Sequence, residues 1–118
     1  MSIYNLELTS VAFDNLEKNL DMKTLEEIEE ILKQSKPLLH ENYQITQLGI
    51  FGSYVRGEQT ENSDVDVLID YEHAPTLFKL VEIRDYLSNL IGMKVDIVTK
   101  NGLKPRIREQ VLLEVVYV

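Results

Sequence analysis

Apolar residues recur with the three-to-four-residue spacing of a helix over residues 24–34. The stripe that they form consists of Leu25, Ile28, Ile31 and Leu32. Thr24 and Glu27 make a capping box at the start of this helix. Because a proline removes a backbone hydrogen bond inside a helix, we expect Pro37 to end it.

Two more helices are predicted in the second half of the chain. One begins near Pro75 and runs to Ile91, and Gly92 suits its left-handed end. Its buried face is expected to hold Leu80, Ile83, Leu87, Leu90 and Ile91. The other begins at Pro105, since proline fits the first turn of a helix, and one of its sides carries Ile107, Val111 and Val115.

Three segments have the composition of strands, namely residues 44–51, 64–70 and 94–99. The order helix, strand, strand, helix, strand, helix predicts a mixed α/β (α+β) domain. We expect residues 1–118 to form one domain, because no linker divides them. Residues 1–22 are interpreted as an N-terminal extension of unassigned role, since the apolar positions of residues 3–20 follow no single period.

The dipeptide that follows the first predicted strand is suited to binding phosphate. Gly52 permits a tight turn and the close approach of a ligand, and Ser53 can cap a short helix that Gly57 would end. Free N–H groups at a helix start attract phosphate, and Arg56 adds a positive charge nearby. A simple capped turn would have the same sequence, so this pair alone does not decide between the two readings.

Ten residues after Ser53, two carboxylates stand on one face of a predicted strand. Residues two apart in a strand point the same way, so Asp64 and Asp66 project together, while the opposite, buried face holds Val65, Val67 and Ile69. Adjacent carboxylates repel each other, and hard cations such as Mg²⁺ or Mn²⁺ relieve that repulsion. The alternative is a solvated strand end, and we assign Asp70 to that class.

A third carboxylate lies within the last predicted strand. Asp96 stands among β-branched residues, where aspartate is a poor strand former. If this strand pairs with residues 64–70, Asp96 can complete a metal-binding triad with Asp64 and Asp66. Three acids around two metal ions are the usual arrangement for in-line displacement at phosphorus. The sequence therefore predicts catalytic and metal-binding roles for these three aspartates.

Composition and charge limit the cellular location and the kinds of partner that we expect for the chain. Its 20 Asp and Glu against 12 Lys and Arg give a formal net charge of −8, the wrong sign for a nucleic-acid binder. The charge indicates either an ordinary acidic surface or a field that steers a basic protein partner. The chain has no Cys, no apolar run long enough to span a membrane and no signal-peptide pattern, so we expect a cytoplasmic location without membrane contact.

Several other residues allow two readings each. Lys104, Arg106 and Arg108 could neutralise a triphosphate or be ordinary solvated charges, and we favour the second reading. Tyr54 could lie beside a nucleotide base or pack on the sheet. The apolar segment 115–118 could complete the core or enter a partner interface.

The motif resembles the signature of the DNA polymerase β nucleotidyltransferase superfamily: Gly52-Ser53, ten residues, Asp64-Val65-Asp66. The local sequence of residues 51–58 and 63–69 resembles that of the minimal nucleotidyltransferase (MNT) group of this superfamily. It is similar to that of the MntA-type antitoxins that pair with HEPN toxins. The resemblance covers roughly residues 24–118 and leaves the first twenty or so residues outside. It implies a mixed sheet with helices mainly on one face.

The resemblance also implies an activity, with ATP as substrate and Mg²⁺ as cofactor. Members of this group transfer AMP to a tyrosine of the cognate HEPN ribonuclease and so silence it. Applied to this sequence, the resemblance implies nucleotide binding at Gly52, Ser53 and Arg56. Two alternatives stay open: an antitoxin that neutralises its partner by binding alone, and a nucleotidyltransferase that acts on a small molecule.

Overall fold

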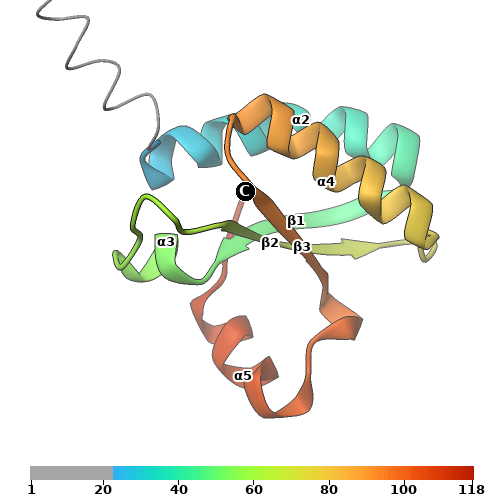
Figure 1. Ribbon diagram of the computed structural model, residues 1–118. Coiled ribbons are helices and arrows are strands. Elements are labelled where there is room, and N and C mark those ends of the chain that lie inside the picture. The colour runs from blue at the N-terminus through green and yellow to red at the C-terminus, as the bar shows by residue number, and fades with distance from the viewer. Residues whose placement is uncertain (1–22) are drawn as a thin grey trace, which may run out of the picture.

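Residues 23–118, which the computed structural model describes, build a mixed sheet between two layers of helices (Figure 1). The predicted extension, residues 1–22, lies outside the described residues. In chain order the elements are α2 (Leu25–Tyr43), β1 (Ile45–Phe51), α3 (Ser53–Arg56), β2 (Val65–Tyr71), α4 (Leu77–Ile91), β3 (Val95–Thr99), the 3₁₀ helix η1 (Lys100–Gly102), α5 (Pro105–Glu114) and β4 (Val116–Tyr117). The predicted mixed α/β class is confirmed.

The sheet has four strands in the order β3-β2-β1-β4. β1 is antiparallel to both β2 and β4, whereas β2 and β3 are parallel and are connected through α4. A parallel pair requires such a crossover, because the chain must return to the end of the sheet at which the first strand begins. The two central strands are β1, which leads into the Gly52-Ser53 turn, and β2, which carries Asp66.

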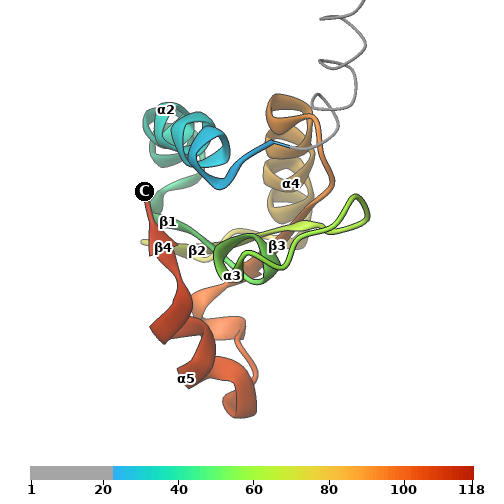
Figure 2. The ribbon, with the colours of Figure 1, turned by 90° about the vertical axis from the view of Figure 1, so that its left-hand side faces the viewer.

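The two faces of the sheet are covered unequally (Figure 2). The long helices α2 and α4 lie side by side on one face, and the main core between them and the sheet includes Ile28, Leu32, Val65, Val67, Ile69, Ile83 and Leu87. The shorter α5 lies on the opposite face, where a second cluster joins Leu68, Leu103 and Val111. This distribution agrees with the expectation that helices lie mainly on one face. The predicted burial of Val65, Val67 and Ile69 is also confirmed.

The ends of α2 and α4 follow the predicted local chemistry, except at Pro37. Thr24 and Glu27 form the capping box at the start of α2, and Gly92 ends α4 with a left-handed φ of 77°. The prediction that Pro37 ends the first helix is wrong, because α2 continues to Tyr43. Pro37 stands on the exposed side of the helix, where water can satisfy the carbonyl group that loses its partner. Burial of Leu39 beyond the proline favours continuation of the helix.

The apolar segment 115–118 completes the sheet instead of standing free. β4 pairs with β1, the backbone N–H of Val118 donates to the carbonyl of Leu48 at 2.9 Å, and Lys36 Nζ donates to the carbonyl of Val118 at 2.8 Å. The structure thereby supports the first of the two readings of this segment. Across residues 23–118, no helix combines the length and apolar character that crossing a membrane requires.

Candidate active site

The turn between β1 and α3 is built on a glycine in a conformation that other residues avoid. Gly52 has φ 84° and ψ −153°, and its carbonyl accepts hydrogen bonds from the N–H groups of Val55 and Arg56. Gly52 is thus the N-cap, and the prediction that Ser53 caps this helix is wrong: Ser53 is its first residue and no side chain caps it. The helix starts one residue early because the glycine makes the sharp turn by itself. Gly57 ends the helix at φ 72°, as predicted.

Asp66 lies at the centre of the candidate site because of the strand register. Its position on β2 is opposite Phe51 on β1 and opposite Asp96 on β3. Residues in register on neighbouring strands point to the same face of a sheet, so Asp66 and Asp96 lie on the face that also carries α5. The expected pairing of the Asp96 strand with the Asp66 strand is confirmed.

Burial and neighbouring charge make Asp66 unusual electrostatically. The pKa of Asp66 is raised to about 6, first by burial of the half-buried side chain and then by the charges of Asp96 and Asp64. Arg56 opposes this rise and Glu114 adds to it, both more weakly. Asp96 and Asp64 thus both disfavour ionisation of Asp66. Asp64, which was predicted to lie on the strand, immediately precedes β2.

The glycine turn and Asp66 are in direct contact. A Cβ atom placed on Gly52 would collide with Oδ2 of Asp66. Only a residue without a side chain leaves room for this carboxylate beside the turn. The two halves of the sequence motif, one in the turn after β1 and one at the start of β2, thus meet at this point.

The fit of the aspartates to a divalent cation depends on their chemistry and their mutual repulsion. As they stand, no three His, Asp or Glu side chains within residues 23–118 converge closely enough to form a metal centre. Carboxylate oxygens are the donors that Mg²⁺ and Mn²⁺ prefer. The pKa of Asp66 is raised first by burial and then by the negative charges of Asp96 and Asp64, which a cation would neutralise. The residues therefore fit a hard divalent cation in type and in charge.

A cavity of about 380 Å³ adjoins Asp66 and Asp96 on the α5 side of the sheet. Its lining combines these acids with apolar and basic side chains, including Phe51, Val98, Leu103, Lys104 and Ile107. Arg106 also lines it. Lys104 and Arg106, which the sequence allowed either as phosphate-binding residues or as solvated charges, therefore face the candidate site. Arg108 does not belong to this lining and instead donates to the carbonyl of Lys100 at 2.6 Å.

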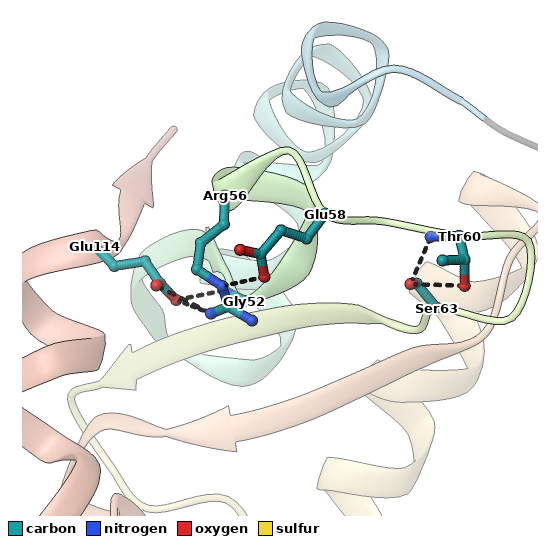
Figure 3. A network of polar contacts seen from close by, with 6 residues as sticks. All are labelled: Gly52, Arg56, Glu58, Thr60, Ser63 and Glu114. Carbon is teal, nitrogen blue, oxygen red and sulfur yellow. Dashed lines mark hydrogen bonds and ion pairs between the residues drawn. The ribbon is translucent and has the colours of Figure 1, made fainter.

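Polar contacts hold the segment around Arg56 and the loop before Asp64 (Figure 3). Arg56 contacts Glu58 through Nε at 3.0 Å and Glu114 through Nη1 at 3.1 Å. Before Asp64 the loop is closed on itself, because the Thr60 N–H donates to Ser63 Oγ at 2.8 Å. Sequence reasoning missed Glu114 altogether.

Tyr54, the other residue with two readings in the motif, belongs to the core. Its side chain is 2% exposed, and its hydroxyl lies 3.6 Å from Sδ of Met93. The structure therefore supports packing on the sheet for Tyr54, not a place beside a nucleotide base.

Comparison with known proteins gives a consistent result. The family model described as nucleotidyltransferase domain matches residues 25–118. The protein adenylyltransferase MntA of Thermococcus cleftensis is 53% identical over 97 residues, which cover 82% of this chain and 98% of the relative. A solved minimal nucleotidyltransferase superposes with a TM-score of 0.67 at 36% identity, covering 80% of this chain and 96% of its own.

A more distant solved structure shares the fold. It is a chain from the complex between a tri-AMPylated HEPN toxin of Shewanella oneidensis and an MNT antitoxin. Its TM-score is 0.58 at 18% identity, and the match covers 76% of this chain and 70% of that chain.

Proposed function

The chain belongs to the nucleotidyltransferase domain family and is a transferase, and from this premise we propose that it transfers AMP from ATP to a hydroxyl group of a partner protein. The observation that carries the proposal is the contact between the Gly52 turn and Asp66, with Asp96 in register beside it. This arrangement brings a candidate phosphate-binding turn next to candidate metal ligands. The name of the Thermococcus relative supports a protein acceptor.

Asp64, Asp66 and Asp96 are the residues that would hold divalent metal ions, most simply Mg²⁺. When bound, two such ions supply charge neutralisation for the triphosphate and activation of the acceptor hydroxyl. The charges of Asp64 and Asp96 both act on Asp66, which supports a shared role of the three acids in holding metal. In the transfer, the acceptor oxygen bonds to the α-phosphorus as the bond to pyrophosphate breaks. Pyrophosphate leaves with the bonding electron pair, and the hydroxyl proton passes to solvent.

Gly52 and Ser53 would receive the phosphates of ATP. Gly52 has no side chain, so the turn can lie directly against Asp66. Ser53, partly exposed, would offer its backbone N–H and hydroxyl. Arg56 would add positive charge at the same turn, although two carboxylates already share its guanidinium.

The partner is proposed to be a HEPN-type ribonuclease toxin with a tyrosine as the acceptor. The complex of the structural neighbour pairs an MNT antitoxin with an AMPylated HEPN toxin, which supports this class of partner. The acidic character of the chain, with a net charge of −8, favours a basic partner. The cavity beside Asp96 offers room for an acceptor side chain next to the proposed metal ligands.

Co-expression with the proposed HEPN-type partner tests this function. We expect the intact mass of that protein to increase by one or more adenylyl groups with the wild-type chain. With Asp64→Asn/Asp66→Asn no increase should occur, although the fold is kept. Full activity of the double variant would refute the proposed catalytic site. Stable binding without any mass increase by the wild type would support neutralisation by binding alone.

A further inference from the structure

Glu114, the last residue of α5, reaches into the turn that follows β1 (Figure 3). Its Oε2 accepts a hydrogen bond of 2.6 Å from the backbone N–H of Gly52, 62 residues earlier in the chain. The side chain is only 13% exposed, so little water competes for this contact. A charged acceptor on a backbone N–H is among the stronger hydrogen bonds in proteins.

Arg56 fixes the orientation of the Glu114 carboxylate. Its Nη1 lies 3.1 Å from Oε1 and 3.3 Å from Oε2 of Glu114, while its Nε donates to Glu58. The guanidinium therefore neutralises a carboxylate that would otherwise stand uncompensated next to a site for phosphate. Because Arg56 holds the carboxylate, Oε2 of Glu114 stays in position to accept from the Gly52 N–H.

The turn needs such an anchor, because glycine has the widest conformational freedom of any residue. Gly52 must hold φ 84° and ψ −153° to present Ser53 and to leave room for Oδ2 of Asp66. Within α3 itself no side chain caps the start of the helix. The Gly52 N–H is instead held from α5, on the face of the sheet opposite α2 and α4.

We propose that Glu114 is a positioning residue of the nucleotide site, which holds the Gly52–Ser53 turn in the conformation that receives the triphosphate. This inference rests on the proposed function and deepens it. Glu114 acts through Gly52 and contacts neither nucleotide nor acceptor. The hydrogen bond to Gly52 requires an acceptor oxygen and not a negative charge, which separates this role from a purely electrostatic one.

Nucleotide affinity, measured without turnover, tests the proposal. The probe is α,β-methylene-ATP with MgCl₂, titrated calorimetrically into the full chain at a temperature where every variant is folded. We expect Glu114→Ala to weaken binding by about tenfold or more, as for the loss of a hydrogen bond to a charged group. Glu114→Gln should stay within about threefold of the wild type, since its amide oxygen can still accept from Gly52.

Glu109→Ala is the matched control, because Glu109 is an exposed acid on the same helix. It should leave the affinity unchanged. If Glu114→Ala does not fold, the comparison of Glu114→Gln with Glu114→Asp replaces it: the shorter aspartate cannot reach Gly52 and should bind the nucleotide more weakly than the glutamine variant. Rescue by glutamine is not expected of a residue that only contributes charge.

The outcomes separate this inference from the proposed function. If Glu114→Ala binds the probe as tightly as the wild type, or more tightly, the positioning role is overturned and Glu114 instead competes with phosphate. Equal weakening by alanine and glutamine would also overturn it, in favour of a charge effect. If the wild type itself does not bind the probe, the proposed function fails, and the inference fails with it.

Discussion

Asp66 of β2 and Asp96 of β3 stand directly opposite each other in a parallel strand pair, so that two carboxylates share one face of the sheet. Like charges directly opposite each other on neighbouring strands destabilise a sheet. Without a counter-charge, this pairing therefore costs stability. Its energetic consequences can be measured without knowing the acceptor.

The first prediction concerns Asp66 without metal. Its folded-state pKa of about 6 exceeds the value of about 3.9 in an unfolded chain. As pH rises between these values, the unfolded chain loses the proton first, so the folded protein loses stability. Asp66→Asn removes this loss. In EDTA at about pH 8 we expect the variant to gain about 1 kcal/mol, an amount reduced for the solvent that reaches this half-buried group.

Urea denaturation at several pH values measures this gain. It should shrink to nothing by about pH 3, below both pKa values, where Asp66 is protonated in both states. Asp70→Asn is the control, since Asp70 lies on the same strand but is not among the charges that raise the pKa of Asp66. A gain that is equal at all pH values would contradict the assigned cause.

The second prediction concerns metal binding. Mg²⁺ or Mn²⁺ should raise the thermal unfolding temperature of the wild type, and the stabilisation should approach about 2.7 kcal/mol at a hundred times the dissociation constant. Asp66→Asn and Asp96→Asn should reduce this shift, whereas Asp70→Asn should retain it. Equal shifts in all variants would place the metal elsewhere.

The third prediction uses two glycines with positive φ. Alanine at Gly57 meets no atom within 4 Å, so only the left-handed backbone is strained, by about 1 kcal/mol. Alanine at Gly52 meets Asp66 as well, in a backbone region that is essentially restricted to glycine, and we expect about 3 kcal/mol or more. In an Asp66→Ala background the Gly52 substitution should cost at least about 1 kcal/mol less, as a double-mutant cycle would show.

Local chemistry in the sequence predicted most of the fold. The capping box of Thr24 and Glu27 and the glycine at position 92 define helix ends within a few residues, so their effect can be read from short segments. Pro37 misled the prediction because the effect of a proline depends on whether its side of the helix is exposed, which is a tertiary property.

The candidate site was predictable only where strand periodicity applies. The shared face of Asp66 and Asp96 follows from their positions in two strands, once those strands are known to be neighbours. Glu114 could not be found in this way, because its hydrogen bond to Gly52 joins residues 62 positions apart through the return of α5 to the sheet. The N-cap was misassigned to Ser53 because glycine can take the same role without a side chain.

The last prediction concerns association with the partner. The net charge of −8 should steer a basic HEPN-type protein toward this chain. Association should therefore slow as salt increases, because the Debye length falls from about 30 Å at 0.01 M to about 8 Å at 0.15 M. Stopped-flow fluorescence across this range measures the rate, and a rate independent of salt would contradict steering.

Binding and modification should also be separable. Asp64→Asn/Asp66→Asn should still form the complex, because these acids are proposed to hold metal and not the partner. Without covalent modification, however, neutralisation should end when the complex dissociates, since only a bound antitoxin then blocks the toxin. Growth rescue followed by withdrawal of antitoxin expression compares the two forms. Rescue by the double variant that lasts as long as rescue by the wild type would favour neutralisation by binding over adenylyl transfer.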